Sequence, residues 1–88
     1  MTERTVTVAN RAGVHARPAS RLVKLAAHYE SDIWIECRGD RVNGKSIMGI
    51  ITLGAGFHSE LTINATGADE RAAVDAIVSL VERKFADE

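Results

Sequence analysis

Residues 32–43 read Asp-Ile-Trp-Ile-Glu-Cys-Arg-Gly-Asp-Arg-Val-Asn. This stretch predicts two adjacent strands of a sheet. Ile, Ile and Cys occupy every second position from 33 to 37, which is typical of a strand with one face open to water. Gly39 and Asp40 are predicted to form a tight turn into a short strand over 41–43. The two strands therefore form an antiparallel hairpin in this prediction.

The segments on either side of the hairpin supply two more strands and three helices. The strands are indicated by alternating apolar and polar residues, and the longer helices by apolar residues at i, i+3, i+4 and i+7. A serine that can cap its start and a glycine that can end it bound the short central helix. The predicted order is strand 5–8, helix 16–29, strand 32–38, strand 41–43, a short helix between Ser46 and Gly54, strand 60–66 and helix 69–85.

This order of elements predicts an α+β fold, a two-layer sandwich in which the helices cover one face of the sheet. The chain has 88 residues, which is enough for one small hydrophobic core and not for two. No repeat, linker or low-complexity tract interrupts it. We therefore assign residues 1–88 to a single domain, whose function is expected at the surface rather than in a deep cavity.

Composition excludes several classes of function. Eleven basic residues against 12 acidic ones give a net charge of −1, which predicts no binding of nucleic acid. The lone Cys37 and three dispersed histidines show no ligand spacing, so neither a metal nor a cofactor is expected, and His28 and His58 are interpreted as structural or surface residues. No apolar run has the length of a signal peptide or a membrane span, so we expect a cytoplasmic protein without membrane insertion.

A histidine stands directly before a predicted helix, in Gly-Val-His-Ala-Arg-Pro-Ala-Ser at 13–20. The first amides of a helix have no intrahelical acceptor, and together with the helix dipole they form an anion site. Pro18 fits the first turn, which leaves the amides of Ala16 and Arg17 free to meet phosphate oxygens. Arg17 adds a planar cation, and a neutral imidazole is nucleophilic near pH 7. We predict a phosphohistidine at His15; the ordinary alternative is a solvated histidine at a turn.

Ser46 opens a second informative segment, Lys-Ser-Ile-Met-Gly at 45–49. Its hydroxyl is placed to cap the short helix, and capping alone is a sufficient role for it. Ile47, Met48 and Ile51 follow on a helix of one or two turns, which is too short to bury them all. We expect some of them to form a docking patch, in which Met48 adapts to several partners. The alternative is that all of them belong to the core.

Both segments resemble the signatures of a known family, the histidine-containing phosphocarrier protein HPr of the bacterial phosphotransferase system. Gly-Val-His-Ala-Arg-Pro-Ala at 13–19 resembles its active-site signature, and Asn-Gly-Lys-Ser-Ile-Met-Gly-Ile at 43–50 resembles its second one. Gly-Ala-Asp-Glu at 67–70 is similar as well, and the likeness covers almost the whole chain. The resemblance implies an open-faced β-sandwich of four antiparallel strands with three helices on one face.

The resemblance also implies a function, that of a phosphoryl carrier which is not itself an enzyme. His15 would accept phosphate from phosphorylated enzyme I and pass it to the IIA domains of sugar permeases, with Arg17 assisting the transfer. The helix after Ser46 and the histidine loop would form one docking surface, bordered by Lys24 and Lys45. We expect the carrier to be a monomer.

Ser46 resembles the regulatory site of HPr proteins that are modified by HPr kinase/phosphorylase. A phosphate there would lie close to the surface that binds enzyme I and would repel it. The chain has Ala27 and Gly49 where some members of the family carry lysines, which weakens the basic rim of that surface.

Two other hypotheses stay open beside the sugar-linked carrier. One is a regulatory module controlled through Ser46, with little or no role in sugar transport; the presence of His15 argues against it. The other is a carrier of the nitrogen-related branch, a regulatory phosphorelay that would use the same site chemistry.

Overall fold

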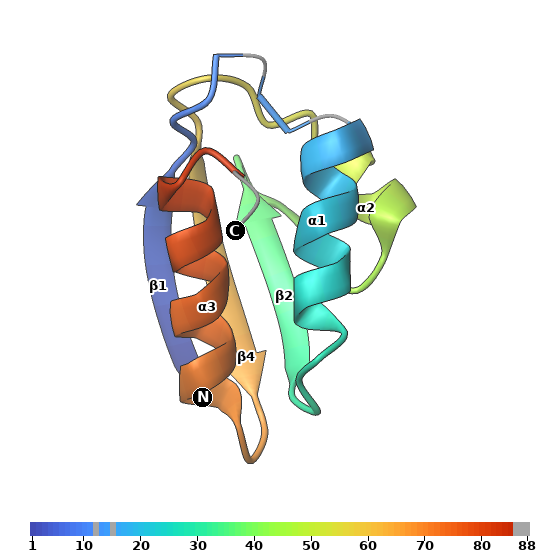
Figure 1. The fold of residues 1–88 in the computed structure, drawn as a ribbon, viewed down its shortest axis with the longest axis vertical. Helices are drawn as coiled ribbons and strands as arrows, with labels where there is room; N and C mark the ends of the chain where they lie inside the picture. Colours follow the sequence, from blue (N-terminus) through green and yellow to red (C-terminus); the bar gives the residue numbers. More distant parts are fainter. Residues whose placement is uncertain (12, 15, 86–88) are drawn as a thin grey trace.

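The computed structural model describes residues 1–11, 13–14 and 16–85, and its elements follow the predicted order. They are β1 (Thr2–Thr7), α1 (Ala16–Ala26), β2 (Asp32–Cys37), β3 (Asp40–Asn43), α2 (Ile47–Leu53), β4 (Glu60–Thr66) and α3 (Glu70–Glu82). The strands form one antiparallel sheet in the order β1-β4-β2-β3 (Figure 1), which confirms the predicted α+β fold of four strands and three helices. None of the described helices is both long and apolar enough to span a membrane.

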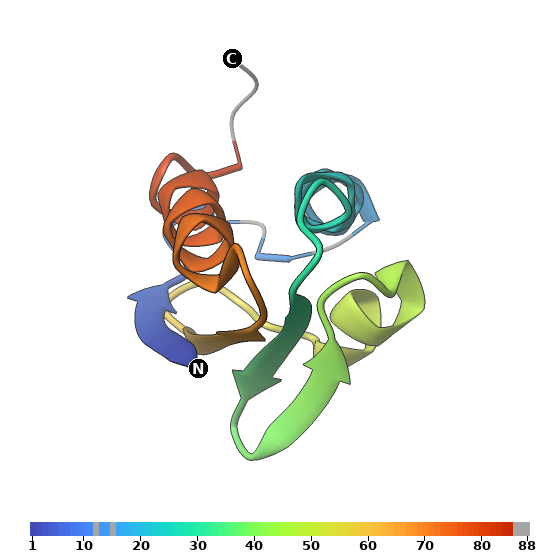
Figure 2. The same cartoon turned by 90° about the horizontal axis from the view of Figure 1, so that it is seen from below.

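The core lies between the sheet and the helices. Every second residue of β2 and β4 is buried, as the pleat of a strand requires when one face is covered. Figure 2 shows α1 and α3 on the same side of the sheet, with α2 beside α1 next to β3. Cys37, one of the alternating apolar residues of β2, is buried with them. The largest fully buried side chains are Phe85, Leu22, Ile33, Ile35, Ile50, Leu61, Ile63, Ile77, Val8, Val74, Val78 and Val81.

The opposite face of the sheet carries polar side chains in rows that run across the strands. Glu3, Asn64 and Trp34 are direct neighbours in one such row. Asn64 Nδ2 donates a hydrogen bond of 3.0 Å to Glu3 Oε1. Arg41 lies 4.6 Å from the centroid of the half-buried Trp34 ring, a cation–π contact. Trp34 therefore lies on the polar side of its strand, as the alternation predicts.

β1 is shifted from the predicted range 5–8. It pairs with β4 along its whole length, from Thr2 opposite Ala65 to Thr7 opposite Glu60. Its first residues show no apolar alternation, because an edge strand needs only backbone pairing on one side.

The first long helix ends at Ala26 rather than at Tyr29. Beyond the helix end, at His28 and Tyr29, the backbone hydrogen bonds join residues three apart instead of four, as in a 3₁₀ turn. The His28 amide bonds to the Leu25 carbonyl at 3.1 Å. The Tyr29 amide bonds to the Ala26 carbonyl in the same way, also at 3.1 Å. Because the helical periodicity continues through residues 27–29, the pattern alone does not predict that the helix ends at Ala26.

The C-terminal helix ends at Glu82 rather than at Phe85, because a Schellman motif terminates it. Lys84 adopts a left-handed φ of 59°, and its amide bonds to the Val81 carbonyl at 3.0 Å. The Phe85 amide reaches back to the Leu80 carbonyl at 2.9 Å, and the Phe85 side chain is buried in the core. A glycine usually occupies the position of Lys84, so the sequence carries no sign of this stop.

Asp69 ties the start of α3 to the residues before β2. Its carboxylate accepts hydrogen bonds from the Glu30 amide at 2.9 Å, the Ser31 amide at 3.0 Å and the Ser31 hydroxyl. The Ser31 hydroxyl, followed by the Glu30 amide, lowers the pKa of the Asp69 carboxyl below its ordinary value. Asp69 is the N-cap residue of α3, but its side chain makes this link instead of capping its own helix.

Glu70 ties β1 to the same end of the molecule. Its carboxylate accepts a hydrogen bond of 2.6 Å from the Thr2 hydroxyl and one of 3.2 Å from the Gly67 amide. It also lies 3.0 Å from the Met1 ammonium. These partners, the Thr2 hydroxyl foremost, lower the pKa of Glu70 from 4.5 to about 2. The charged carboxylate therefore stabilises the fold above about pH 4.5, and this stabilisation is lost as the pH falls towards 2.

Replacement of Glu70 by Gln is expected to lower the melting temperature by a few degrees at neutral pH, because the charged acceptor is lost. Thermal unfolding measured between about pH 2 and pH 7 checks this, with Glu82→Gln as a control at an exposed carboxylate. The gap between the wild type and Glu70→Gln should close as the pH approaches 2. A gap of the same size at every pH would contradict the assigned role of the charge.

Candidate functional site

His15, the predicted phosphate acceptor, lies outside the described residues, and the segments on either side define its surroundings. Before it, Val14 is buried with 6% of its surface exposed, and its amide donates a hydrogen bond of 2.8 Å to the Ala55 carbonyl. After it, Ala16 begins α1. The chain on both sides of His15 is thus fixed, by the core on one side and by a helix on the other.

Gly13 allows this loop to lie directly on the loop that follows α2. It has a φ of 75°, and an added Cβ would lie 2.7 Å from the Ala55 carbonyl oxygen and 2.9 Å from the Gly56 Cα. Asn10 closes the turn before it: the Gly13 amide bonds to the Asn10 carbonyl at 3.0 Å, and Asn10 Nδ2 donates to the Gly13 carbonyl at 2.6 Å. The Asn10 Oδ1 atom is buried and has no donor among the described residues. Only glycine fits at position 13.

The first turn of α1 suits an anion. It contains no acidic residue, and the first amides of a helix lack intrahelical acceptors. Ala16 and Arg17 are exposed, whereas Pro18 is buried against the core. Arg17 makes no hydrogen bond or ion pair with the residues that the structure describes, so its guanidinium can turn towards a phosphate. The predicted phosphate-binding groups therefore lie at an accessible helix start.

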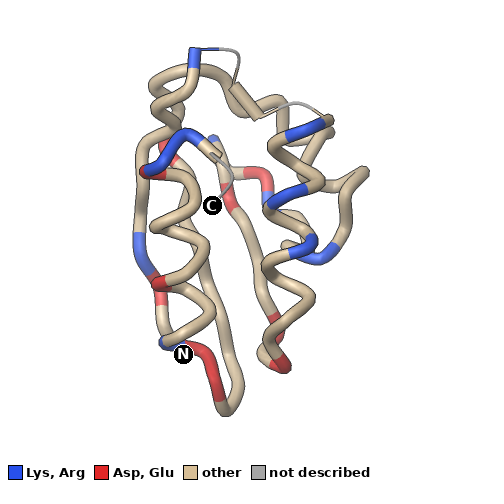
Figure 3. The backbone as a smooth tube through the Cα atoms, in the orientation of Figure 1, with Lys and Arg blue, Asp and Glu red and all other residues tan. Residues whose placement is uncertain are grey.

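Charge is distributed unevenly although the net charge is only −1. Figure 3 shows Lys and Arg along α1, whereas the loops at the far end of the molecule, before β2 and before α3, are acidic. Arg17, Arg21 and Lys24 follow one another at helical spacing. Arg21 is half-buried and donates to the Phe85 carbonyl, whereas Lys24, a predicted partner-binding residue, is exposed. The end of the molecule that carries His15 is thus suited to an acidic partner.

The helix α2 exposes part of its apolar surface, as predicted. Ile47 is 40% exposed and Met48 is 67% exposed, while Ile50 is buried. Ile51, which was predicted in the same patch, is half-buried and packs against the core. We call Ile47 and Met48 the α2 patch. A Met side chain at this exposure is suited to partners of different shape.

Ser46 and Gly54 bound α2 as predicted. The Ser46 Oγ accepts a hydrogen bond of 3.1 Å from the Gly49 amide, so the serine is the N-cap. Gly54 follows the helix with a φ of 61°, and its amide bonds to the Ile51 carbonyl at 3.1 Å. Ser46 is half-buried beside the α2 patch.

Lys45, predicted to border the docking surface, has a structural contact. Its Nζ donates a hydrogen bond of 2.7 Å to the Tyr29 carbonyl, beyond the end of α1, and its side chain is half-buried. This bond helps to hold α2 against α1, and the two helices pack on each other.

Arg38 is a residue whose role the sequence did not reveal. Cys37 pairs with Asp40, so the two-residue hairpin turn is Arg38-Gly39 and not Gly39-Asp40 as predicted. Both turn residues have positive φ, 51° and 86°, as a type I′ turn requires. From this turn Arg38 Nη2 donates to the carbonyls of Leu53 and Gly54, both at 3.2 Å, and so holds the C-terminal end of α2.

One depression of the molecular surface lies away from the candidate site. A depression of about 120 Å³ lies on the polar face of the sheet, which the helices do not cover. Within the described ranges, no three His, Cys, Asp or Glu side chains gather closely enough to hold a metal ion. The residues lining the depression are Glu3, Trp34, Glu36, Arg41, Thr62 and Asn64.

Known proteins are similar to this chain in both sequence and fold. A model of the family described as "PTS HPr component phosphorylation site" matches residues 2–83. The phosphocarrier protein HPr of Treponema pallidum is 48% identical over 88 residues, which are 100% of both chains. A crystal structure of HPr from Thermoanaerobacter tengcongensis has a TM-score of 0.94 at 43% identity, covering 100% of this chain and 99% of that one. HPr from Bacillus anthracis has a TM-score of 0.87 at 40% identity, covering 91% and 95%.

Replacement of Gly13 by Ala is expected to lower the free energy of unfolding by about 3 kcal/mol or more, since a strained φ and a backbone clash add. Gly39→Ala is the matched control, because Gly39 has a φ of 86° but no atom within 4 Å of an added Cβ. It should cost about 1–2 kcal/mol, the strain alone. Urea unfolding of both variants measures the difference. Equal losses would show that the close approach of the two loops contributes nothing.

Proposed function

Since this chain belongs to the HPr family of phosphocarrier proteins of the phosphotransferase system, we propose that His15 carries the phosphate, accepting it from enzyme I and passing it to IIA domains of sugar permeases. The chain is a phosphocarrier and not a catalytic enzyme. The observation that carries the assignment to His15 is its place directly before α1, whose first turn has exposed residues and no carboxylate.

The transfer follows from these groups. A neutral imidazole nitrogen of His15 attacks the phosphorus atom while the bond to the donor breaks, and the donor keeps the electron pair. Charge on the phosphoryl oxygens is stabilised by the amides of Ala16 and Arg17 and by the Arg17 guanidinium. Delivery to the next protein is the same step in reverse, with His15 as the leaving group. No metal or cofactor in the carrier is required for this scheme.

Docking in this proposal uses the α2 patch together with the basic side of α1. Ile47 and Met48 supply apolar contact, Ile51 supports them from below, and Lys24 faces an acidic partner. Lys45 contributes mainly by holding α2 in place. The active form is a monomer in this scheme, because the surface around His15 has to be free. The free, buried Cys37 fits a reducing cytoplasm, where we place the carrier.

Ser46 is proposed as a regulatory phosphorylation site, modified by an HPr kinase/phosphorylase. Its hydroxyl lies at the start of α2, next to the exposed Ile47 and Met48. A phosphate there adds nearly two negative charges to a surface that we assign to acidic partners, while its oxygens can still accept from the Gly49 amide. Phosphorylation would therefore weaken docking without unfolding the helix.

His15→Ala is expected to abolish phosphate uptake, because no other residue in the proposed scheme accepts it. Intact-protein mass spectrometry after incubation with enzyme I, Mg²⁺ and phosphoenolpyruvate measures uptake, and acid lability identifies a phosphohistidine. Arg17→Ala should slow uptake by about 100-fold, the usual loss when a stabilising donor is removed. His28→Ala is the matched control at an exposed histidine beyond α1 and should behave as wild type. Labelled His15→Ala protein, or an acid-stable adduct, would refute the assignment.

Ser46→Asp is expected to raise the KM for enzyme I by about tenfold, through repulsion of an acidic partner. Ser46→Asn is the matched control, because Asn caps a helix as well as Asp does but carries no charge. Steady-state phosphate transfer with increasing carrier concentration measures both variants. Equal KM values for the two variants would reduce Ser46 to a helix cap.

A further inference from the structure

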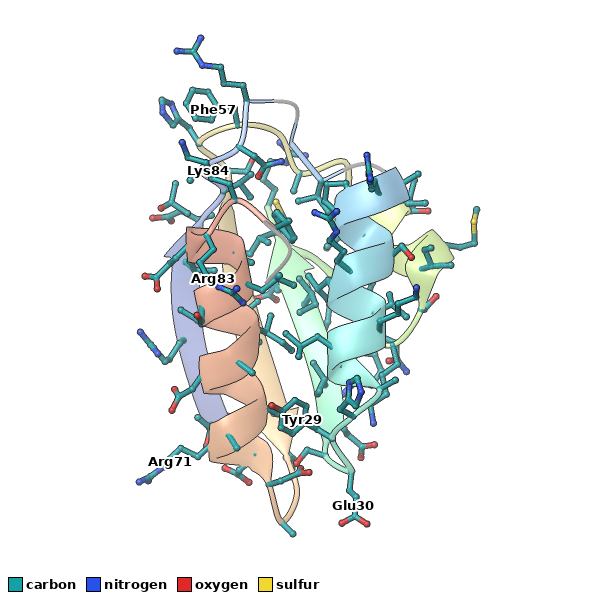
Figure 4. The ribbon with its side chains drawn as sticks, in the orientation of Figure 1. Tyr29, Glu30, Phe57, Arg71, Arg83 and Lys84 are labelled. Carbon is teal, nitrogen blue, oxygen red and sulfur yellow. The ribbon has the colours of Figure 1, made fainter. Side chains whose placement is uncertain are left out.

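Phe57 and His58 form an exposed aromatic pair between α2 and β4. The ring centroids lie 3.8 Å apart, the planes are inclined by 29°, and Phe57 is 43% exposed. Figure 4 shows the Phe57 ring at the upper end of the molecule, pointing away from the sheet. Phe57 belongs to no part of the hydrophobic core. The fold therefore gains little from this side chain where it lies.

The backbone at His58 is strained. Its φ is 74°, in the left-handed region that favours glycine, and a histidine there destabilises the fold relative to glycine. The strain is held by hydrogen bonds on both sides: the His58 amide donates to the Val8 carbonyl at 3.0 Å, and the Gly56 amide donates to the Ser59 hydroxyl at 3.1 Å. A strained backbone that presents an exposed aromatic pair indicates a function for the pair.

The loop that carries the pair is continuous with the support of the His15 segment. Ala55 accepts the Val14 amide, and Val8 exchanges backbone hydrogen bonds with His58 and Ser59. In the common orientation of Figures 1 and 4, the start of α1 lies between Phe57, which Figure 4 labels, and α2, which Figure 1 labels. The pair is therefore fixed relative to Val14 and the start of α1, on the side away from the α2 patch.

We propose that Phe57 and His58 form a second anchor for the protein that exchanges phosphate with His15, an acidic-rimmed partner with an apolar recess that takes the Phe57 ring. Lys84 is exposed at the same end of the molecule, as Figure 4 shows, and Arg11 precedes Gly13 in the adjoining loop. Basic side chains around an aromatic centre match such a partner. This inference rests on the proposed function and adds a contact surface to it.

Two anchors on opposite sides of the start of α1 constrain a docked partner more than one anchor does. The α2 patch alone lets a partner pivot, whereas a second fixed contact sets the angle at which the donor and acceptor groups meet. Phosphate transfer needs the attacking and leaving atoms in line, so the second anchor orients the transfer in both directions. Phe57 and His58 act in this as positioning residues and touch no reacting atom.

Phe57→Ala and His58→Gly test the proposal, with His28→Ala as the control at another exposed histidine. His58→Gly removes half of the pair and relieves the strained φ, so it should unfold at the same or a higher temperature than the wild type. Both variants should raise the KM for enzyme I or for a IIA domain by about three- to tenfold, and the loss of orientation should lower kcat as well. Direct binding of the same variants in a His15→Ala background separates docking from chemistry.

The second anchor would be overturned if both variants kept the wild-type KM and binding affinity for enzyme I and for the IIA domain. Phosphate uptake by the wild type would leave the proposed function intact in that case. A fall in kcat with unchanged KM and unchanged binding would also overturn the second anchor, since it would show that the pair contributes no docking contact. Absence of phosphate uptake by the wild type itself would refute the proposed function, and the anchor with it.

Discussion

The hydrogen bond from the Val14 amide to the Ala55 carbonyl connects the segment before His15 with the loop that follows α2. Val14 stands just ahead of His15 and α1, and Ala55 follows Gly54, the residue that ends α2. The bond therefore fixes the start of one helix relative to the end of the other. It is possible only because Gly13 has no side chain, since an added Cβ would lie 2.7 Å from the same carbonyl oxygen.

The remaining contacts around α2 keep that arrangement rigid. Ser46 caps its start, Arg38 reaches across from the β2–β3 turn to the carbonyls at its end, and Lys45 ties its approach to the residues after α1. A helix of seven residues has little stability by itself, so these bonds and its packing hold it. A rigid α2 allows Ile47 and Met48 to remain exposed without loosening the core.

The sequence predicted correctly the elements whose ends are marked by characteristic residues. The fourth strand, Glu60–Thr66, and both ends of α2 agree with the prediction, because alternation, a capping serine and a glycine mark them. It missed the end of α3, where Lys84 takes the left-handed conformation of a glycine. The hydrogen bonds from Arg38 to the end of α2 are tertiary contacts, which no pattern in the neighbouring sequence predicts. The signatures around His15 and Ser46 predicted the candidate site. The exposure of Phe57, on which its proposed role depends, could be found only from the fold.

A carrier has to hold phosphate firmly enough to keep it and loosely enough to release it, and the proposed site would do both with few groups. In the proposed scheme, helix amides and the guanidinium of Arg17 stabilise the charge, while the exposure of Ala16 and Arg17 keeps water and partners close to it and limits the strength of each contact. A deep pocket with several buried cations would bind more tightly and release more slowly. The small core of this 88-residue chain suits the proposed task, because the proposal places discrimination between donor and acceptor in the docking surface and not in the phosphate site.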